Sequence, residues 1–529
     1  MKDFVGNELM QTNRERKGVF YTPLKWVKLS QKYMADYFGE DWQEEYYIWD
    51  CAAGTGNLLV GLTEPHRIWA STIDQAEVDI MKTRIGNDVN LLESHIFKFD
   101  FLNDDFSKCP IELQKILNDE EKRKKLIIYI NPPYAEHGDK KQVSGTGKNK
   151  SGVATETTIY KKYHNEISSA ARELSAQFLI RIYKEIFGCK IAQFSKLKIL
   201  QAGNFIKFRN TFKAKLEKLF IVPANTFDNV KGKFPIGFFI WDTKITEELK
   251  CIDACAYDKN STLITCKTIY NYDNKQLVIK WLQKFYSSKN YIAYLCMRGT
   301  DVQNNNFIYI TSKPSDNDFK EKLFTYITQD NVIETSIYYT IRNIVKNTWI
   351  NDRDQYLYPL PSWEADEEFK TDCLAYTLFN NKIKSEHGIN HWIPFKEKEV
   401  GAKDCFESHF MTDYMLGKVK PTSLASQGSL LELKSSLQNK PLKFSNEAQD
   451  VFDAGRELWK YYHSKPDANP NAALYDIKDY FQGRNAKGRM NKNSKDEIYN
   501  NLMDNLRGKL KILAHKIIPK IYEHGFLLK

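Results

Sequence analysis

The first half of the chain alternates short apolar runs with amphipathic segments. Residues 23–38 and 174–186 place apolar side chains at three- and four-residue steps, the spacing of one helix face, and Gly188 ends the second segment. Continuous apolar runs, typical of strands buried on both faces, occupy residues 46–50, 67–74, 95–100, 126–130, 190–200, 216–223 and 234–242. Strands that alternate with helices predict an α/β fold built on a doubly wound, mostly parallel sheet.

The alternation ends near residue 246. Mixed strand and helix patterns continue to about residue 425, and the remaining residues are mostly helical, with apolar faces over 451–462 and 502–521. A basic, Gly- and Asn-rich segment, 484–495, separates these two helices and is loop-like. We therefore predict three parts: an α/β domain over residues 1–245, an α+β domain over 246–425 and a helical C-terminal region over 426–529.

The composition is that of a globular protein. The chain has 529 residues, of which 42% are hydrophobic and 27% charged, and this length suffices for about three domains. The net charge of +10 and the pI near 8.8 favour an anionic partner such as nucleic acid, although many basic proteins bind none. Charge alone therefore does not decide between these classes.

Cysteine usage and hydropathy bear on the compartment. The nine cysteines are scattered and form no C-x-x-C pair, which argues against a zinc site and predicts free thiols in a reducing cytoplasm. The N-terminus lacks the apolar core of a signal peptide, and no stretch approaches the roughly 18 apolar residues of a membrane span. We therefore expect a soluble, cytoplasmic protein with no metal and no membrane partner.

The ends of the first three predicted strands carry residues suited to a nucleotide-like ligand. Asp50 and the glycines of DCAAGTGN (50–57) allow a tight turn and a close approach to the backbone, before a predicted helix whose first N–H groups are free. Asp74 ends the second strand, where a carboxylate can accept both hydroxyls of a ribose. Asp100, followed by Phe101, ends the third and can accept an adenine amino hydrogen beside a stacking ring. Each acid alone is more typical of a helix N-cap or a solvated loop, but their order favours a cofactor site.

The fourth apolar run continues into Asn131-Pro132-Pro133-Tyr134. Two consecutive prolines remove two backbone donors and fix two φ angles, so the chain leaves the sheet in one defined shape. In open α/β sheets this carboxyl edge is where ligands bind. A proline turn that only ends a strand is the alternative for this motif when it is considered alone.

Five motifs in this order resemble those of gamma-group N6-adenine DNA methyltransferases. They are GVFYTP (18–23), DCAAGTGNLL (50–59), the acid of STID (71–74), FDFL (99–102) and NPPY (131–134). The resemblance covers residues 16–245 and implies a Rossmann-like catalytic domain, with S-adenosyl-L-methionine as the cofactor. It implies that this cofactor is bound by Phe20, Tyr21, Thr22, Asp50, Ala52, Gly54, Gly56, Asn57, Asp74, Asp100 and Phe101. One departure is Cys51-Ala52-Ala53, where the family usually has Pro-Ala-Cys; since both contribute mainly backbone and small volume, we expect little effect.

The resemblance also implies the reaction, methylation of an adenine flipped out of double-stranded DNA. The amino nitrogen of adenine is a poor nucleophile because its lone pair is delocalised into the ring. Acceptance of the two amino hydrogens by the Asn131 side chain and the Pro132 carbonyl would direct that lone pair at the methyl group, and Pro132 and Pro133 keep these acceptors fixed. Tyr134 would stack on the extruded base. Phe234 is the candidate for its second face, with a core position as the more typical alternative.

Candidate DNA contacts lie in two places. The insert after NPPY carries Lys140, Lys141, Lys148 and Lys150, which can bind phosphates or form a plain solvated loop. Arg342 and Arg353 lie in the segment 246–425, which the resemblance makes the target-recognition domain; the alternative for this region is a buried Trp349 amid charged residues that only face solvent.

Several readings remain open. RNA and protein-glutamine N-methyltransferases share NPPY, but they generally lack the F-Y-T-P element and a large following domain. A catalytically silent DNA-binding subunit is a further alternative. The resemblance is also compatible with a bacterial or mobile-element enzyme, solitary or the modification part of a restriction-modification system, with a restriction or specificity subunit as a possible partner. The recognised sequence and the oligomeric state are not predicted.

Overall fold

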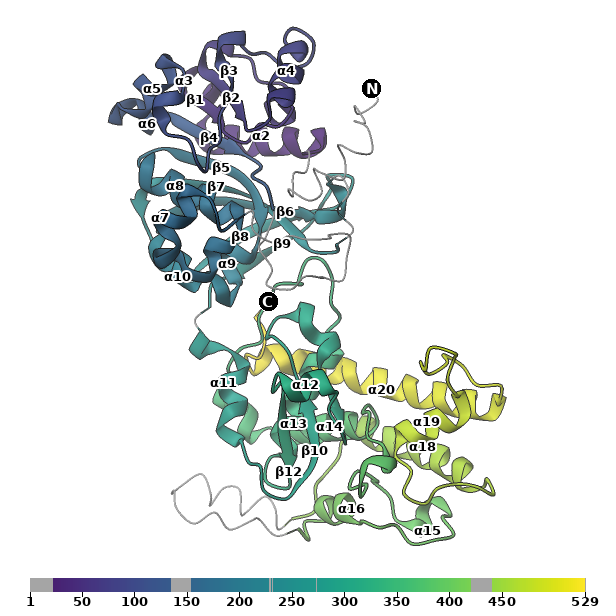
Figure 1. Ribbon diagram of the computed structural model, residues 1–529. Coiled ribbons are helices and arrows are strands. Elements are labelled where there is room, and N and C mark those ends of the chain that lie inside the picture. Colours follow the sequence, from purple (N-terminus) through teal and green to yellow (C-terminus); the bar gives the residue numbers. More distant parts are fainter. Residues whose placement is uncertain are drawn as a thin grey trace. The chain divides into compact units, whose positions relative to one another are not determined.

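The computed structural model describes residues 22–134, 154–227, 230, 232–272, 274–419 and 440–528 (Figure 1). The chain divides into two compact units. The N-terminal unit comprises residues up to 273 together with the segment 348–354, and the C-terminal unit comprises residues 274–347 and 355 onward. Each unit has its own buried hydrophobic clusters.

A nine-stranded sheet forms the centre of the N-terminal unit, in the order β3-β2-β1-β4-β5-β7-β6-β8-β9. Its strands are β1 (Tyr47–Asp50), β2 (Ile68–Thr72), β3 (Ile96–Lys98), β4 (Leu126–Ile130), β5 (Lys190–Lys196), β6 (Ala214–Pro223), β7 (Pro235–Thr246), β8 (Cys251–Tyr257) and β9 (Leu263–Tyr270). Strands β1 to β5 pair in parallel, whereas β7 runs antiparallel to both β5 and β6. The strand order and directions confirm the predicted α/β fold with a doubly wound, Rossmann-like sheet.

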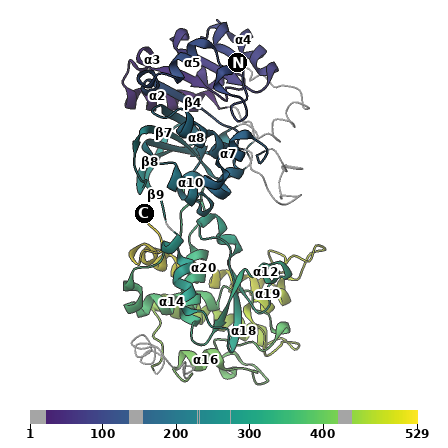
Figure 2. The same cartoon turned by 60° about the vertical axis from the view of Figure 1, so that its left-hand side comes forward.

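Helices cover both faces of this sheet. They are α2 (Leu24–Phe38), α3 (Trp42–Glu45), α4 (Gln75–Arg84), α5 (Ile111–Leu117), α6 (Glu120–Lys124), α7 (Thr158–Ile167), α8 (Leu174–Glu185), α9 (Lys198–Gln201) and α10 (Ile206–Thr211). In β4, Ile128 packs with α7, α8 and α10, which lie together in Figure 2, in what we call the α8-side cluster. Tyr129 packs with Trp26 of α2 in the α2-side cluster on the opposite face. Since alternate strand residues enter opposite layers, both kinds of position are apolar, which explains the continuous apolar runs.

The segment after the glycine motif differs from the prediction. Instead of a helix, the structure has one turn of 3-10 helix, Asn57–Leu59, after which Val60 is extended and Gly61 takes a φ of +88°. This left-handed conformation ends the turn, and it is one that glycine adopts without steric cost. The first α-helix after β1 is therefore α4, which follows β2.

The N-terminal sheet continues past residue 246, where the sequence analysis placed a domain boundary. Strand β8 pairs in parallel with β6, and β9 pairs antiparallel with β8. Segment 348–354 joins the same unit, because Trp349 and Ile350 pack against the α8-side cluster and Lys267 of β9 forms an ion pair with Asp354, with Nζ–O distances of 2.6 and 2.7 Å.

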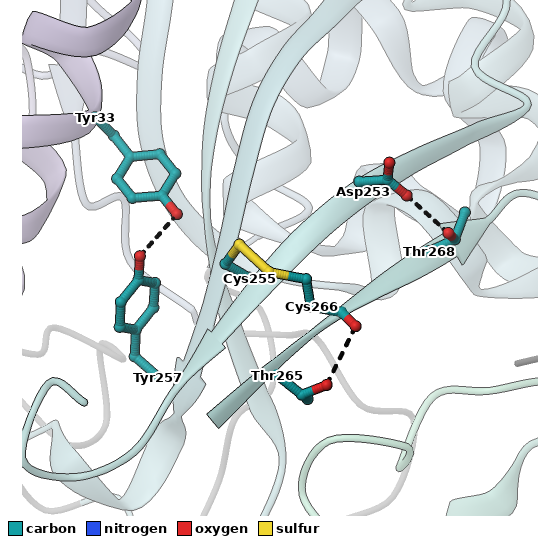
Figure 3. Close-up of a disulfide and its surroundings, with 7 residues drawn as sticks. All are labelled: Tyr33, Asp253, Cys255, Tyr257, Thr265, Cys266 and Thr268. Carbon is teal, nitrogen blue, oxygen red and sulfur yellow. Dashed lines mark hydrogen bonds between the residues drawn. A yellow bond between two sulfur atoms is a disulfide. The ribbon is translucent and has the colours of Figure 1, made fainter. Parts of the chain in front are cut away.

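The structure corrects the expectation that all nine cysteines are free thiols. Cys255 of β8 and Cys266 of β9 form a disulfide, shown in Figure 3. The two residues are directly opposed in the antiparallel register, with Cα atoms 4.1 Å apart. The sequence separation of 11 residues gave no signal for this pairing, because the register of β8 and β9 is needed to predict it.

The C-terminal unit is built around one large hydrophobic cluster. Its strands, in the sheet order β11-β10-β12, are β10 (Tyr291–Cys296), β11 (Tyr309–Thr311) and β12 (Phe324–Thr328). Its helices are α11 (Val278–Leu282), α12 (Asp316–Lys320), α13 (Val332–Ile344), α14 (Glu367–Leu378), α15 (Glu397–Val400), α16 (Phe410–Met415), α18 (Asn446–His463), α19 (Leu474–Gln482) and α20 (Glu497–Glu523). No helix in the described part of either unit is long and apolar enough to cross a membrane.

Helix α20, near the C-terminus of the chain, packs into the same core as helices from earlier in this unit. Its residues Leu506, Leu513 and Ile517 belong to the same buried cluster as residues of α13 and α14. The Lys516 ammonium of α20 also forms ion pairs with Glu368, Asp372 and Glu447, at 2.7, 3.1 and 3.0 Å. Residues on both sides of the boundary expected near 426 therefore share one core, and the three-part division remains a prediction about function.

Candidate active site

Asn131 is fixed at the exit of β4 by two side chains. Its Nδ2 donates a hydrogen bond to Thr22 Oγ1, at 2.9 Å, and the Tyr134 hydroxyl donates to its Oδ1, at 2.5 Å. Burial raises the pKa of Tyr134, so the phenol keeps its proton and acts as the donor. The structure thus brings together three predicted site residues and orients the Asn131 amide. The Tyr134 ring is itself buried, 8% exposed, among residues on the α2 side of the sheet.

Lys196 is a site residue that the sequence analysis missed. It ends β5, which pairs with β4, and its Nζ lies 3.4 Å from the Tyr134 carbonyl oxygen and 5.8 Å from the centre of the Tyr134 ring. The ammonium therefore holds the backbone after the two prolines. A lysine at the end of a predicted strand adjacent to the β4 exit was the available signal.

Asp50 ends β1 as a buried acid, only 1% exposed. Its Oδ1 accepts a hydrogen bond from the Ala52 N–H at 3.0 Å. Burial raises the pKa of this carboxyl to about 8, and the Ala52 hydrogen bond opposes the shift. A buried carboxylate with a raised pKa favours a cationic partner, which would compensate its charge.

The glycine turn that follows has a defined backbone. Gly54 and Gly56 have φ angles of +55° and +83°, in the left-handed region that glycine adopts readily. The sequence analysis also missed Arg84 of α4, which donates to the Thr55 carbonyl at 2.7 Å and to Asn57 Oδ1 at 2.6 Å. The turn is therefore held by a guanidinium from the next helix along the chain.

The acids after β2 and β3 both take part in local turns. Asp74 is exposed and caps α4, because its carboxylate accepts from the Ala76 N–H at 3.0 Å. Asp100 is half-buried, and its carboxylate accepts from the Leu102 N–H at 3.0 Å and from Asn103 Nδ2 at 2.8 Å. Since β1, β2 and β3 are parallel neighbours, Asp50, Asp74 and Asp100 follow the carboxyl ends of adjacent strands.

Phe101 lies in the core rather than at the surface of the site. Its ring is 2% exposed and stacks on Phe178 with a centroid distance of 4.9 Å, and the Arg181 guanidinium lies 5.0 Å from its centre. Arg181, another residue that the sequence analysis missed, also donates to the carbonyls of Phe101 and Asp104. This buried arginine therefore fixes the turn that carries Asp100.

The remaining stacking candidate, Phe234, is half-buried beside the α2-side cluster. The segment before it is tied to α2, because the Trp26 indole N–H donates to Thr226 Oγ1 at 2.8 Å. Phe227, which the sequence analysis did not single out, is 3% exposed and contacts the Phe194 ring at 5.9 Å.

The structure corrects the assignment of Arg342 as a DNA contact. Its side chain is completely buried in the C-terminal unit, where it donates to Asn305 Oδ1 at 2.9 Å, the Gly299 carbonyl at 3.1 Å and the Tyr338 hydroxyl at 3.0 Å. A guanidinium enclosed in this way organises the core and does not reach a groove. Arg353 belongs to the N-terminal unit, with a side chain 16% exposed and 3.5 Å from Asp352.

Some predicted site residues lie outside the described residues. They are Phe20, Tyr21, Lys140, Lys141, Lys148 and Lys150. In the described part of the chain, no group of three or more His, Cys, Asp or Glu side chains is arranged to hold a metal ion.

Comparison with models of known protein families finds no match. The chain is 28% identical over 145 residues to the Type II methyltransferase M.VspI of Vibrio sp. (strain 343), and this match covers 27% of the chain and 31% of that protein. The chain therefore matches less than a third of the length of this curated relative.

Solved structures show partial similarity. The DrdV–DNA complex is 14% identical with a TM-score of 0.38, over 63% of this chain and 39% of that one. The methyltransferase subunit of the type I restriction-modification system from Streptococcus thermophilus is 16% identical with a TM-score of 0.32, over 50% of this chain and 52% of that one.

Proposed function

We propose that this protein is a site-specific DNA methyltransferase, which transfers a methyl group from S-adenosyl-L-methionine to N6 of an adenine flipped out of double-stranded DNA. The observation that carries the proposal is the β4 exit, where Thr22 and Tyr134 orient the amide of Asn131. This exit lies beside the carboxyl end of β1, which carries Asp50. The similarity to a type II methyltransferase supports a DNA methyltransferase of a restriction-modification system.

The residues at this edge fit the proposed cofactor. The buried Asp50 carboxylate suits a ligand that carries a positive charge, and the turn at Gly54 and Gly56 allows close approach to the backbone. Asp74 is exposed and can accept ribose hydroxyls while it caps α4. When bound, this cofactor supplies an electrophilic methyl group.

Asn131 and Pro132 would bind the amino group of the target adenine. The Asn131 Oδ1 and the Pro132 carbonyl each accept one amino hydrogen, so that the nitrogen lone pair points away from both. An amide oxygen can accept two hydrogen bonds, so the base can share Oδ1 with the Tyr134 hydroxyl or displace it.

The transfer forms a bond between N6 and the methyl carbon and breaks the bond between that carbon and sulfur. Positive charge develops on N6, and the two oxygen dipoles stabilise it without reorganising. One amino proton then leaves to solvent. Because Asn131 is uncharged, it orients and stabilises the nucleophile and does not act as a base. Lys196, held at the Tyr134 carbonyl, keeps the backbone after the prolines in position.

The test is methyl transfer by the purified protein to duplex DNA, with RNA and bulk protein as alternative acceptors and with the product nucleoside identified by mass spectrometry. We expect N6-methyladenine in DNA. Asn131→Ala should lower turnover by about 100-fold or more, by analogy with the loss of one oxyanion-hole donor, while donor binding is retained. Asn118→Ala, at an exposed position, is the matched control.

Two outcomes would contradict this proposal. Methylation of RNA or of protein glutamine in place of DNA would show that the same site acts on another class of substrate. Tight donor binding with no transfer to any acceptor would indicate a catalytically silent DNA-binding subunit. Repeating the assay with a candidate specificity subunit added tests whether transfer requires a second protein.

A further inference from the structure

The segment between α19 and α20, residues 483–495, carries an unusual charge. It contains five cations and no acid: Arg484, Lys487, Arg489, Lys492 and Lys495. We call these residues the basic hairpin. A run of like charges is often only a solvated surface. Two properties distinguish a binding site from such a surface: whether hydrogen bonds fix the backbone, and whether the cations lack acidic partners.

The basic hairpin has a closed backbone. Arg484 and Met490 form an antiparallel bridge, and the Asn491 N–H donates to the Gly483 carbonyl at 3.0 Å. At the tip, Asn485 Oδ1 accepts from the N–H groups of Lys487 and Arg489, at 2.9 and 3.1 Å. These hydrogen bonds fix the turn that presents the two cations.

The hairpin is also attached to the end of α19. Gln482 Nε2 donates to the Lys492 carbonyl at 2.8 Å, and Asn491 Nδ2 donates to the Gln482 carbonyl at 2.9 Å. Ser494 Oγ donates to the Phe481 carbonyl at 2.6 Å. Binding through a segment held in this way costs less ordering entropy than binding through a free loop.

Four of the five cations keep their charge uncompensated. Only Arg484 has an acid partner, Asp479, at 2.8 Å. Lys487, Arg489, Lys492 and Lys495 are exposed and form no ion pair with any described residue. On the neighbouring helices several cations are paired: Arg456 with Asp453, Lys460 with Glu457, Arg507 with Asp504 and Lys509 with Asp450. Lys511 of α20 is the exception, exposed and without an ion pair to any described residue, so the hairpin differs by gathering four such cations in one short segment.

Lys478 adds a second observation at the same end of the unit. It lies on α19 one turn before Gln482, is half-buried and has no carboxylate partner among the described residues. Burial, and to a smaller extent the nearby Arg507 guanidinium, lower the pKa of Lys478 to about 8. A half-buried ammonium beside another cation is stabilised when an anion approaches.

We propose that the basic hairpin, together with Lys478, binds the phosphate backbone of duplex DNA without reading its sequence. This inference rests on the proposed function. Phosphate is favoured over an acidic protein because the hairpin offers cations and amides but no exposed aromatic or large aliphatic anchor, which protein interfaces use. The contact would set the position of the C-terminal unit on DNA, whereas base contacts elsewhere would specify the site.

The test combines Lys487→Gln, Arg489→Gln and Lys492→Gln in one variant. The control combines Lys398→Gln, Lys403→Gln and Lys460→Gln, which removes the same charge from exposed positions of the same unit. Fluorescence anisotropy measures the affinity of the full-length protein for a duplex with its methylation site and for an unrelated duplex, over a range of salt concentrations.

Each lost phosphate contact should reduce the slope of log K against log salt by about 0.9, so three should reduce it by about 2.7. If the native and variant proteins bind equally at 1 M salt, this reduction in slope corresponds to about 170-fold weaker binding by the variant near 0.15 M salt, equally for both duplexes. A slope equal to that of the control variant would overturn the inference.

The result separates this inference from the proposed function. If the native protein methylates DNA but the hairpin variant binds like the control, the inference fails and the proposed function stands. If the native protein binds neither duplex, both fail. If the hairpin variant loses affinity for single-stranded RNA but not for duplex DNA, the anion is RNA and the inference is overturned.

Discussion

The buried acid at the end of β1 leads to a quantitative prediction about pH. Burial raises the pKa of Asp50 from the ordinary 3.8 to about 8. Because the folded protein holds this proton more tightly than the unfolded chain, the group lowers the free energy of unfolding as pH rises between those two values, and its effect is constant above pH 8. The slope is roughly 1.4 kcal/mol per pH unit, and the upper bound over the window is roughly 6 kcal/mol.

The same proton opposes binding of a cationic cofactor. If only the ionised form of Asp50 binds S-adenosyl-L-methionine, the competent fraction rises from about 1% at pH 6 to about 50% at pH 8. Donor affinity should therefore rise about 50-fold over these two pH units. Calorimetric titration across this range measures the effect, and urea unfolding without donor measures the stability slope.

Asp50→Asn keeps the size of the side chain and an oxygen that can accept the Ala52 N–H. We expect this variant to bind the donor more weakly at pH 8 and to lose both the rise in affinity and the stability slope assigned to Asp50. Asp79→Asn, at an exposed position of α4, is the matched control and should keep both. Equal pH dependence of donor affinity in the native protein and in Asp50→Asn would refute the assignment, since the ligand's own amino group titrates identically in both.

Other predictions test the remaining assignments. Asp74→Ala should weaken donor binding by about 1–3 kcal/mol in the same calorimetric assay, the scale of a lost hydrogen bond to a charged group, and unchanged affinity would exclude Asp74 as the ribose ligand. Arg342→Ala should lower the free energy of unfolding by about 3–5 kcal/mol in urea titrations, because it leaves buried acceptors unpaired; unaltered stability with weaker DNA binding would contradict its burial. Exchange of residues 274–347 and 355–528 with those of a relative of different specificity should change the methylated sequence, and an unchanged site would place recognition elsewhere.

Much of the N-terminal unit could be predicted because its strands and their ends are encoded in short, local sequence patterns. Buried parallel strands read as continuous apolar runs, and the strand ends are marked by Asp50, Asp74, Asp100 and Asn131, whose order follows the chain. The orientation of the Asn131 amide could not be predicted in the same way. It depends on Thr22, which is 109 residues away in the sequence and meets Asn131 only in the folded sheet.

Long-range packing explains the wrong predictions. The sequence around Arg342 is typical of a charged surface, but α13 is buried over nearly its whole length. The carbonyls that accept hydrogen bonds from the Arg342 guanidinium belong to a loop about 40 residues earlier in the chain. The pairing of Cys255 with Cys266 depends on the register of two strands at the sheet edge. Neither property is present in a local pattern of polar and apolar positions.

The division of the chain also bears on where sequence recognition lies. In the proposed function, the β4 exit holds one base in any context. Contacts there would not distinguish flanking base pairs, which must be read at base edges in a groove. A boundary at residue 246 would remove β8 and β9 from the sheet to which they are paired. A boundary at 426 would cut a core that α20 shares with α13 and α14. If the proposed function holds, we therefore propose that recognition belongs to the C-terminal unit as a whole. Segment 348–354 stays in the N-terminal unit, where Lys267 holds Asp354.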